Sequence, residues 1–181
     1  HLREETLNCF SIQKNIRVIP NFIDFDLHKY IYDKDLHMYY APIQEKIMIH
    51  ISNFRPVKRV TDVIRVFVNV REKMPVKLLM VGDGPQRDVA EYLCRDLGCS
   101  NDVKFLGKTQ DVSRLLAISD LFVLPSEIES FGLVALEAMA AGIPVVSSNT
   151  GGLAHLNING VTGYTSAVGD VAKMSNDAIS L

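Results

Sequence analysis

The sequence lacks tryptophan, contains three cysteines among 181 residues, and carries almost no net charge. Its formal charge of −2, from 19 basic and 21 acidic side chains, provides no basic surface of the kind that binds DNA or RNA. No apolar run approaches the ~18 residues of a membrane-spanning helix. The odd number of cysteines, without paired spacing, argues against a disulfide framework and favours a reducing, cytoplasmic setting.

Motifs for two kinds of chemistry are also missing. The five histidines share no metal-ligand spacing, and the sequence contains no G-x-S-x-G, H-E-x-x-H or C-x-x-C motif, so we expect neither a hydrolase nor a zinc enzyme. The histidine within the predicted strand at Lys46–Ser52, His50, is expected to be simply packed. Cys94 and Cys99 are expected to be buried or half-buried thiols.

What is present indicates a folded domain. Hydrophobic residues make up 48% of the chain and charged residues 22%, which excludes a disordered segment. The length suits one domain or slightly more. The first ten residues, HLREETLNCF, and the last twelve, DVAKMSNDAISL, look helical and have no start or stop signals, so we expect a piece of a longer protein.

Short apolar runs alternate with segments of helical spacing. The predicted strands are Arg17–Pro20, Lys46–Ser52, Val76–Val81, Val103–Leu106, Leu121–Leu124, Pro144–Ser147 and Gly163–Thr165. The predicted helices are Val60–Lys73, Gln86–Leu97, Asp111–Ser119 and Phe131–Ala141. This alternation predicts an α/β fold with a doubly wound, Rossmann-like parallel sheet. The segment from Asp24 to Gln44 is expected to be irregular.

In such a sheet, ligands bind outside the carboxyl ends of the strands, so the loops that follow strands are the candidates. The loop after the second predicted strand places Arg55, Lys58 and Arg59 beside the start of a helix, where an anion would satisfy them. A solvated basic loop explains the same pattern equally well. The next loop contains Gly82 and Gly84, which permit close approach to a ligand, but the third glycine of the dinucleotide fingerprint is missing.

Two further loops contain motifs that point to ligand binding, one weakly and one more strongly. Gly107-Lys108-Thr109 imitates the end of a phosphate-binding P-loop but lacks its first glycine, so we discard it as an ATPase signal. The stretch ESFGLVALE is more informative, because Ser130 is a candidate helix cap and Glu137 is the only charge on a helix that is apolar nearly all round. That helix is therefore expected to be buried, with Glu137 meeting donors.

The carboxylates Glu129 and Glu137 would flank the free N–H groups of Phe131, Gly132 and Leu133 at the start of this helix. A nucleoside diphosphate attached to a sugar would satisfy both the N–H groups and the carboxylates. The alternative is that Glu129 is a solvated loop residue and that Glu137 bridges to a neighbouring helix.

The stretch ESFGLVALE resembles the donor-site signature of retaining GT-B glycosyltransferases of family four, and the motifs VGDGP, FLG, SDLFVLPS, EAMAAGIPVV and the GG loop follow the order of that family's C-terminal domain. The resemblance covers nearly the whole chain and implies a nucleotide-sugar-binding domain. It divides the chain into residues 1–45, the end of an inter-domain helix with a first strand and a connecting loop, and residues 46–181, the Rossmann-like domain. The acceptor-binding N-terminal domain would be a separate part of the protein.

The resemblance also implies roles for individual residues. Glu129, Lys58 and Arg55 are the expected catalytic residues: Glu129 would contact hydroxyls of the donor sugar and Lys58 the diphosphate, while Arg55 would replace a family arginine whose place is held by Asn53. Glu137 would bind the ribose diol. The remaining donor-binding residues are expected to be Asn53, Gly82, Gly84, Gly107 near the uracil, and the backbone of Ser130, Phe131, Gly132 and Leu133. Ala154-His155 departs from the Pro-Glu that is usual in the family.

A narrower resemblance is carried by VIPNFID, HISNFRPVKR, ESFGLVALEAMA and NINGVTGY. It implies transfer of N-acetylglucosamine from UDP-GlcNAc to L-malate, with retention of the α configuration, for bacillithiol biosynthesis in a bacterial cytoplasm. The UDP-sugar is a substrate, and the sequence demands neither a cofactor nor a metal. We expect the protein's own N-terminal domain as a partner, leave a homodimer open, and expect this fragment alone to be inactive. Three alternatives remain: a transferase with another acceptor, such as a cell-surface polysaccharide, a non-catalytic nucleotide-binding module, and, less favoured, an NAD-linked dehydrogenase.

Overall fold

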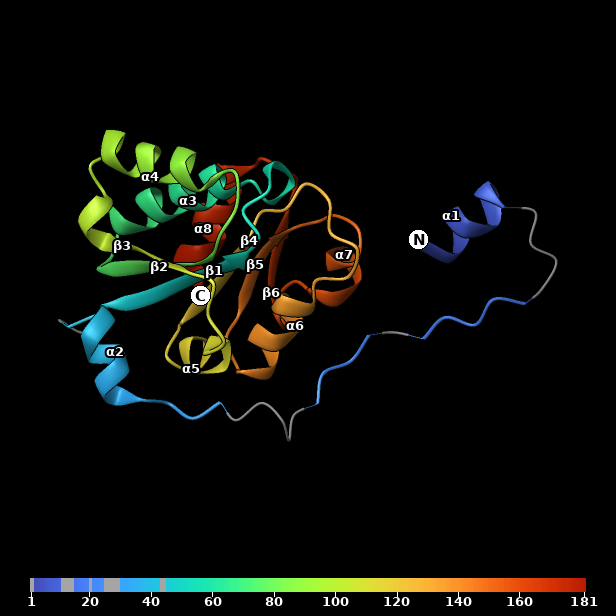
Figure 1. Cartoon of the computed structure of the whole chain (residues 1–181), viewed down its shortest axis with the longest axis horizontal. Helices are drawn as coiled ribbons and strands as arrows, with labels where there is room; N and C mark the ends of the chain where they lie inside the picture. The colour runs from blue at the N-terminus through green and yellow to red at the C-terminus, as the bar shows by residue number, and fades with distance from the viewer. Residues whose placement is uncertain (1, 11–14, 20, 25–29, 43–44) are drawn as a thin grey trace.

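The computed structural model describes residues 2–10, 15–19, 21–24, 30–42 and 45–181. Its centre is a parallel sheet of six strands in the order β3-β2-β1-β4-β5-β6 (Figure 1). The strands are β1 (Lys46–Ser52), β2 (Val76–Gly82), β3 (Val103–Gly107), β4 (Leu121–Leu124), β5 (Val145–Ser148) and β6 (Gly163–Ser166). This order confirms the predicted doubly wound α/β fold. From β1 the chain first builds the sheet outward through β2 and β3, and it then returns to β4 on the other side of β1, so the strand order reverses between β1 and β4.

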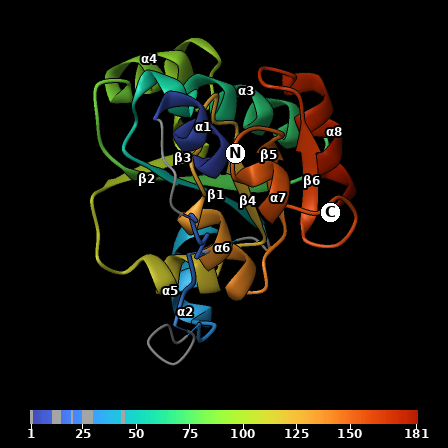
Figure 2. The same cartoon turned by 90° about the vertical axis from the view of Figure 1, so that its right-hand side faces the viewer.

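Helices cover both faces of the sheet (Figure 2). On one face lie α3 (Val60–Arg71), α4 (Arg87–Asp96) and α8 (Val171–Ser180), and on the other lie α2 (Lys34–Tyr40), α5 (Val112–Ala117) and α6 (Leu133–Ala140). The remaining helical segments are α1 (Leu2–Cys9), α7 (Leu153–Leu156) and two 3-10 turns, Pro56–Lys58 and Ser100–Asp102. No helix in the described ranges is long and apolar enough to cross a membrane.

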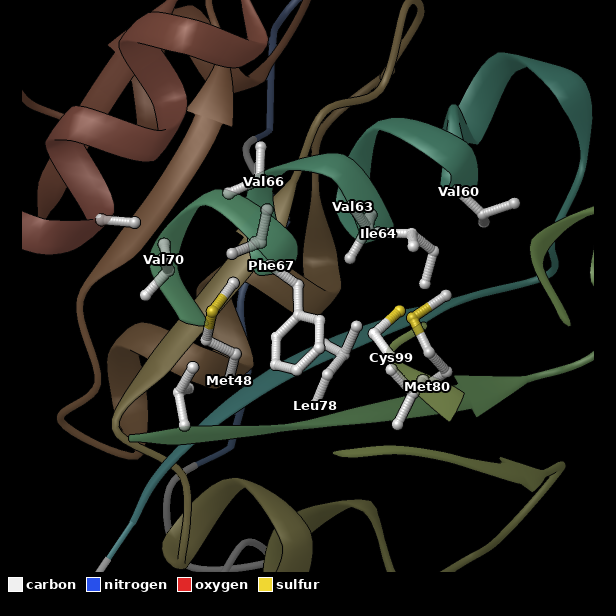
Figure 3. Close-up of a cluster of buried hydrophobic side chains, with 14 of the residues drawn as sticks. Met48, Val60, Val63, Ile64, Val66, Phe67, Val70, Leu78, Met80 and Cys99 are labelled. Atoms are coloured by element: carbon white, nitrogen blue, oxygen red, sulfur yellow. The ribbon is translucent and has the colours of Figure 1, made fainter. Parts of the chain in front are cut away.

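The helix α3 illustrates how the apolar pattern builds the core. Val60, Val63, Ile64, Phe67 and Val70 recur at helical spacing and are at most 2% exposed. Figure 3 shows this face of α3 directed at the methionine and leucine side chains of β1 and β2. Because α3 directly follows the loop after β1, this packing holds the end of that loop in place.

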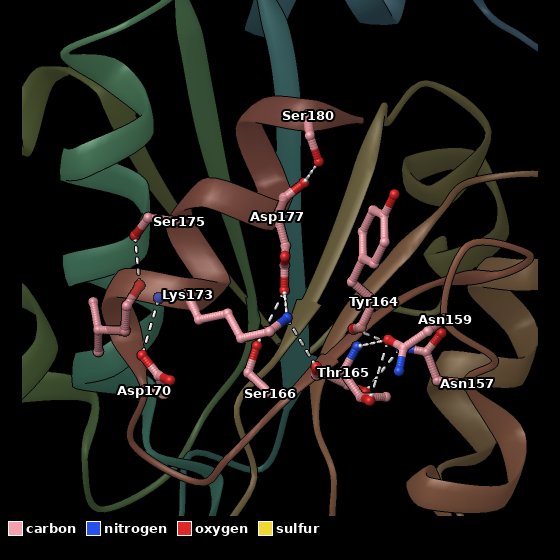
Figure 4. A network of polar contacts seen from close by, with 12 residues as sticks. Asn157, Asn159, Tyr164, Thr165, Ser166, Asp170, Lys173, Ser175, Asp177 and Ser180 are labelled. Atoms are coloured by element: carbon pink, nitrogen blue, oxygen red, sulfur yellow. Dashed lines mark hydrogen bonds and ion pairs between the residues drawn. The ribbon is translucent and has the colours of Figure 1, made fainter.

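A network of polar contacts holds the edge of the sheet that is formed by β5 and β6 (Figure 4). The amide nitrogen of the buried Asn157 donates to the Val145 carbonyl, the Ser147 hydroxyl and the Tyr164 carbonyl at 2.9–3.0 Å. Asn159 Oδ1 accepts the N–H of Thr165 at 2.7 Å. Within the NINGVTGY motif, Asn157 therefore ties β5 to β6 and Asn159 holds β6, so both asparagines have a structural role in this fold.

Most predicted elements are confirmed, with helix ends one or two residues shorter than expected. The predicted strand at Arg17–Pro20 is wrong: Arg17–Ile19 forms no strand, and Pro20 lies outside the described residues. Val18 and Ile19 are 62% and 77% exposed. Their β-branched pattern is local, whereas a strand requires a neighbouring strand to pair with.

The expectation of an irregular segment from Asp24 to Gln44 is also corrected, because Lys34–Tyr40 forms α2. Asp33 caps this helix by accepting the N–H of Leu36 at 3.0 Å. Leu36 then packs against the apolar core on the α5 and α6 side of the sheet. An aspartate before the helix is typical of an N-cap and could have indicated its start, but seven residues are too few to show a clear helical period. The division of the chain at residue 45 stays a prediction.

Candidate functional site

The site lies where the strand order reverses. β1 pairs with β2 over seven residues, but with β4 only at Met48–Leu121 and Ile49–Phe122. Beyond Ile49 the two central strands separate at their carboxyl ends. Two loops, residues 53–59 after β1 and residues 125–132 after β4, flank this separation, which is where doubly wound sheets bind ligands.

An ion pair joins the two loops. Lys58 Nζ lies 2.5 Å from Glu129 Oε2, and the two side chains are only 18% and 16% exposed. A backbone bond from the Glu127 N–H to the Val57 carbonyl, 2.8 Å, fastens the loops a second time. The structure thus brings together the lysine and the glutamate that the sequence singled out, although 71 positions separate them.

A hollow of about 250 Å³ adjoins this pair. Its lining comes from both loops, the end of β4, the start of α6 and the segment before α2: Asn21, Lys58, Leu124, Glu129, Ser130, Phe131, Gly132, Leu133 and Val134. Six of the predicted donor-site residues therefore share one surface. Asn21 was not foreseen as part of it.

The start of α6 differs from the prediction. The helix begins at Leu133, and Gly132 precedes it with a φ of +92°, a conformation that suits glycine. The predicted capping role of Ser130 is therefore wrong, because the chain turns into the helix two residues later. The helix N–H groups that remain without intrahelical partners are those at and just after Leu133, beside the hollow.

The expectation of a buried α6 is also wrong. Only Ala135 and Ala138 are buried, and Leu133 is 43% exposed. The helix lies against the sheet with these alanines, Val134 and Met139 pack partly buried against the same core, and Leu133 stays at the surface. Glu137 is half-buried, and its charge, after burial itself, raises the pKa of the nearby Tyr30 hydroxyl.

Two glycines after β5 support the loop that carries Glu129. The Gly152 N–H donates to the Glu129 carbonyl at 2.9 Å. A Cβ added at Gly151 would lie 2.0 Å from that same carbonyl oxygen, and one at Gly152 would lie 2.4 Å from the Phe131 Cα. The GG loop is therefore packed backbone against backbone, with no room for a side chain.

The other predicted glycines gather on the β2 and β3 side of the same edge. A Cβ at Gly82 would lie 1.8 Å from the Ser52 carbonyl oxygen, and one at Gly84 would lie 2.0 Å from that of Asn53. Gly107 pairs with Gly82 across the two strands. The close backbone approach expected of these loops is thus present, while their contact with a ligand stays a prediction.

The basic residues of the loop after β1 have different surroundings. Arg59 Nε lies 2.6 Å from Asp62 Oδ2, so Arg59 serves the start of α3 rather than the site. Arg55 is exposed and, among the described residues, is not part of the hollow's lining. Its proposed catalytic part stays a prediction, and Lys58 is the cation that the fold places at the hollow.

His50 is fully buried in β1, which confirms the expectation that it is packed. Its Nδ1 lies 2.8 Å from the Val123 carbonyl oxygen and its Nε2 lies 2.8 Å from the Ser52 hydroxyl. Burial, partly offset by the bond to Val123 and reinforced by the charge of Lys58, lowers the pKa of His50 to about 4. The pattern of the strand gave no signal for these two bonds.

Comparison with known proteins identifies a family and a relative. The family model for "Glycosyl transferases group 1" matches residues 24–181. The chain is 42% identical to N-acetyl-alpha-D-glucosaminyl L-malate synthase of Bacillus anthracis, over 99% of the chain and 48% of that protein. It therefore spans about half the length of this relative.

Two solved structures with bound nucleotide have the same fold. A mutant of S. aureus TarM in complex with Fondaparinux, alpha-GlcNAc-glycerol and UDP matches with a TM-score of 0.83 and 26% identity, over 99% of this chain and 34% of that one. Anabaena HepE in complex with UDP and glucose matches with a TM-score of 0.79 and 30% identity, over 88% of this chain and 45% of that one.

Proposed function

This chain belongs to the glycosyl transferases group 1 family, and we propose that it forms the donor-binding half of an enzyme that transfers N-acetylglucosamine from UDP-GlcNAc to L-malate with retention of the α configuration. The 42% identity to a protein of that activity supports the choice of donor and acceptor. The UDP bound by TarM and HepE supports a uridine nucleotide. We place the enzyme in a bacterial cytoplasm, in keeping with the three free cysteines.

The observation that carries the proposal is the Lys58–Glu129 pair at the reversal of the strand order, next to the start of α6. A nucleotide sugar presents both of the groups that this arrangement suits. Its diphosphate would lie against the Lys58 ammonium and the free N–H groups of the helix. The hydroxyls of its sugar would donate to Glu129.

Lys58 would act on the step in which the donor breaks. Transfer cleaves the bond between the sugar's anomeric carbon and the β-phosphate oxygen, so negative charge grows on the departing UDP while positive charge grows on the sugar. A cation held at the β-phosphate stabilises this charge more than it stabilises the intact donor, and such a fixed group is typically worth about 3 kcal/mol of barrier. Glu129 would meanwhile hold the sugar in position.

The remaining predicted residues complete the nucleotide site in this proposal. Glu137, further along α6, would accept the ribose hydroxyls. The loops at Gly82, Gly84 and Gly107 would lie along the nucleotide and the uracil. Arg55, with Asn53 in place of the usual arginine, would assist at the diphosphate.

A binding panel on the intact protein tests the proposal. Calorimetric titrations with UDP, UDP-GlcNAc, ADP and NAD should give measurable and tightest binding for the uridine ligands. Tightest binding of NAD would overturn the proposal in favour of a dehydrogenase. Binding of UDP-GlcNAc without any turnover would identify a non-catalytic module.

The acceptor needs a separate experiment, because the chain spans about half of its relative. The intact protein, UDP-GlcNAc and L-malate should release UDP and form a malate glycoside whose anomeric proton has the small coupling constant of an α linkage. Transfer to a polysaccharide acceptor but not to malate would keep the donor site and reject the acceptor.

A further inference from the structure

A chain of three hydrogen bonds at the carboxyl end of β1 links Phe54, through Ser52 and His50, to Val123. The Val123 carbonyl can only accept, so His50 Nδ1 carries the proton and donates to it over 2.8 Å. A neutral imidazole then has an unprotonated Nε2, which accepts the hydroxyl proton of Ser52 at 2.8 Å. The Ser52 oxygen in turn accepts the N–H of Phe54 at 3.2 Å.

This chain of bonds spans the separation of the central strands. The backbone pairing of β1 with β4 ends at Ile49–Phe122, and His50 is the next residue of β1. Val123 is the next residue of β4. The imidazole therefore replaces the backbone pairing with a side-chain bond at the point where the two strands part.

The far end of the chain of bonds holds a strained turn. Phe54 has a φ of +41°, which costs a non-glycine residue free energy and persists only where neighbours impose it. Its buried ring also stacks on the His50 ring, with 6.0 Å between the ring centroids and 28° between their planes. His50 thus contacts Phe54 through its ring and, by way of Ser52, through the backbone.

The turn at Phe54 sets the course of the chain toward the ion pair. The Phe54 carbonyl accepts the N–H of Gln86 at 2.9 Å, and the next residues form the 3-10 turn that ends at Lys58. A change in the Phe54 backbone would therefore rotate the turn that presents the Lys58 ammonium to Glu129.

We propose that His50 is a positioning residue of the donor site, which holds Lys58 at the diphosphate through Ser52 and the left-handed turn at Phe54. The inference rests on the proposed function, because it assigns His50 to the placement of the group that we expect to contact UDP. His50 touches no substrate in this arrangement. A neutral imidazole is essential, because a proton on Nε2 would turn the acceptor for the Ser52 hydroxyl into a donor.

Two substitutions separate this role from simple packing. His50→Asn keeps an amide N–H at the place of Nδ1, and so the bond to Val123, but removes the bond to Ser52. Ser52→Ala removes the hydroxyl and leaves the imidazole. In the intact protein, each substitution should weaken UDP binding about tenfold. Because both break the same bond, the UDP affinity of the double variant should lie within about twofold of that of either single variant. His37→Asn, the same exchange in α2, is the matched control and should bind UDP as the parent does.

The decisive readout is the dependence on Lys58. In a Lys58→Ala background, His50→Asn should change UDP affinity by less than about twofold, since there is no ammonium left to position. A general loosening of the domain would weaken binding in both backgrounds alike. A tenfold loss that persists without Lys58, or a parent-like affinity of a folded His50→Asn or Ser52→Ala protein, would overturn the inference.

These outcomes are distinct from failure of the proposed function. If the parent protein does not bind UDP, the proposed function fails first. If the parent binds UDP and Lys58→Ala weakens binding while the His50 and Ser52 variants do not, only the positioning role is lost. Should His50→Asn not fold, Ser52→Ala, which deletes a single hydroxyl, decides the question.

Discussion

Lys58 and Glu129 form an ion pair of 2.5 Å across the separation of β1 and β4, with both side chains more than four-fifths buried. Pairs that are exposed on a protein surface contribute about 1 kcal/mol or less, because water screens them. Here the loops shield the charges, so loss of either partner leaves the other poorly solvated. The pair therefore contributes to the structure whatever it binds, and substitutions in it must be compared with neutral controls.

We predict that Lys58→Ala lowers kcat of the intact enzyme at least about 100-fold, because the cation at the departing UDP is lost. The free energy of unfolding should fall as well, because Glu129 is left poorly solvated, so turnover is compared on protein that is still folded. Steady-state transfer from UDP-GlcNAc and a thermal unfolding curve measure the two quantities. Equal turnover in variant and parent would remove Lys58 from the mechanism.

Lys46→Ala is the matched control for this lysine. Its ammonium pairs with Asp120 at 2.8 Å, but at the amino end of β1 and with 58% of the side chain exposed. The same charge is lost at the opposite edge of the sheet, so turnover should stay at the parent value.

Glu137→Gln should weaken UDP binding about tenfold, because a carboxylate that accepts ribose hydroxyls binds them more strongly than an amide does. Titration calorimetry with UDP measures the loss. Glu72→Gln, at the exposed end of α3, removes the same charge away from the site and should leave the affinity unchanged. An unchanged affinity in Glu137→Gln would count against the ribose contact.

Gly151→Ala and Gly142→Ala separate backbone strain from steric conflict. Both glycines have positive φ, +50° and +80°, so alanine costs about 1–2 kcal/mol at either position. Only at Gly151 does the new Cβ meet the Glu129 carbonyl, which should add about 1–3 kcal/mol and displace Glu129. Urea unfolding and UDP titration should therefore show a larger loss of stability, and a loss of affinity, for Gly151→Ala alone.

The protein should become less stable as the pH is lowered through the range in which His50 titrates. Its pKa is about 4 in the folded protein against an ordinary value of 6.5, so below pH 6.5 the unfolded chain binds a proton that the folded protein does not. The free energy of unfolding should decrease as the pH falls from 6.5 toward 4, by a total of the order of 3 kcal/mol.

Urea unfolding curves across this window, compared between the parent and His50→Asn, isolate the contribution. All other titrating groups are common to both proteins, so the difference between the two curves reports His50. Parallel pH dependence in the two proteins would show that His50 is not held neutral by the fold.

The three thiols should differ sharply in reactivity. Cys9 is exposed, whereas Cys94 and Cys99 are buried, and burial raises the pKa of Cys94 to about 12 and also raises that of Cys99. Since the thiolate is the reactive form, iodoacetamide at mildly alkaline pH should label Cys9 alone in the folded protein. Mass spectrometry of the labelled peptides checks this, and labelling of Cys94 before unfolding would contradict it.

The sheet was predictable because strands buried on both faces are continuous apolar runs. β1 and β4 were predicted to the residue, and the helix spacing of α3 matched its buried face. Residues at the ends of such strands necessarily share one edge of the sheet. The sequence could therefore place Lys58 and Glu129 in the same region without any knowledge of their distance.

What could not be predicted depends on tertiary contacts. Arg17–Ile19 has the composition of a strand but pairs with no strand in the part of the chain that the structure describes. The start of α6 is set by the turn at Gly132 and not by the hydroxyl of Ser130. His50 reaches the Val123 carbonyl because the β1–β4 pairing ends at the residue before it. No residue pattern within β1 indicates where that pairing ends.

The early end of the β1–β4 pairing has a consequence for the thermodynamics of binding. The separation of β1 and β4 is fixed by strand geometry and by the side-chain bond to Val123, so folding of the chain itself sets it. The conformational entropy of shaping this opening is lost when the chain folds and not when a nucleotide arrives. We therefore expect a nucleotide to bind with little rearrangement of the surrounding backbone.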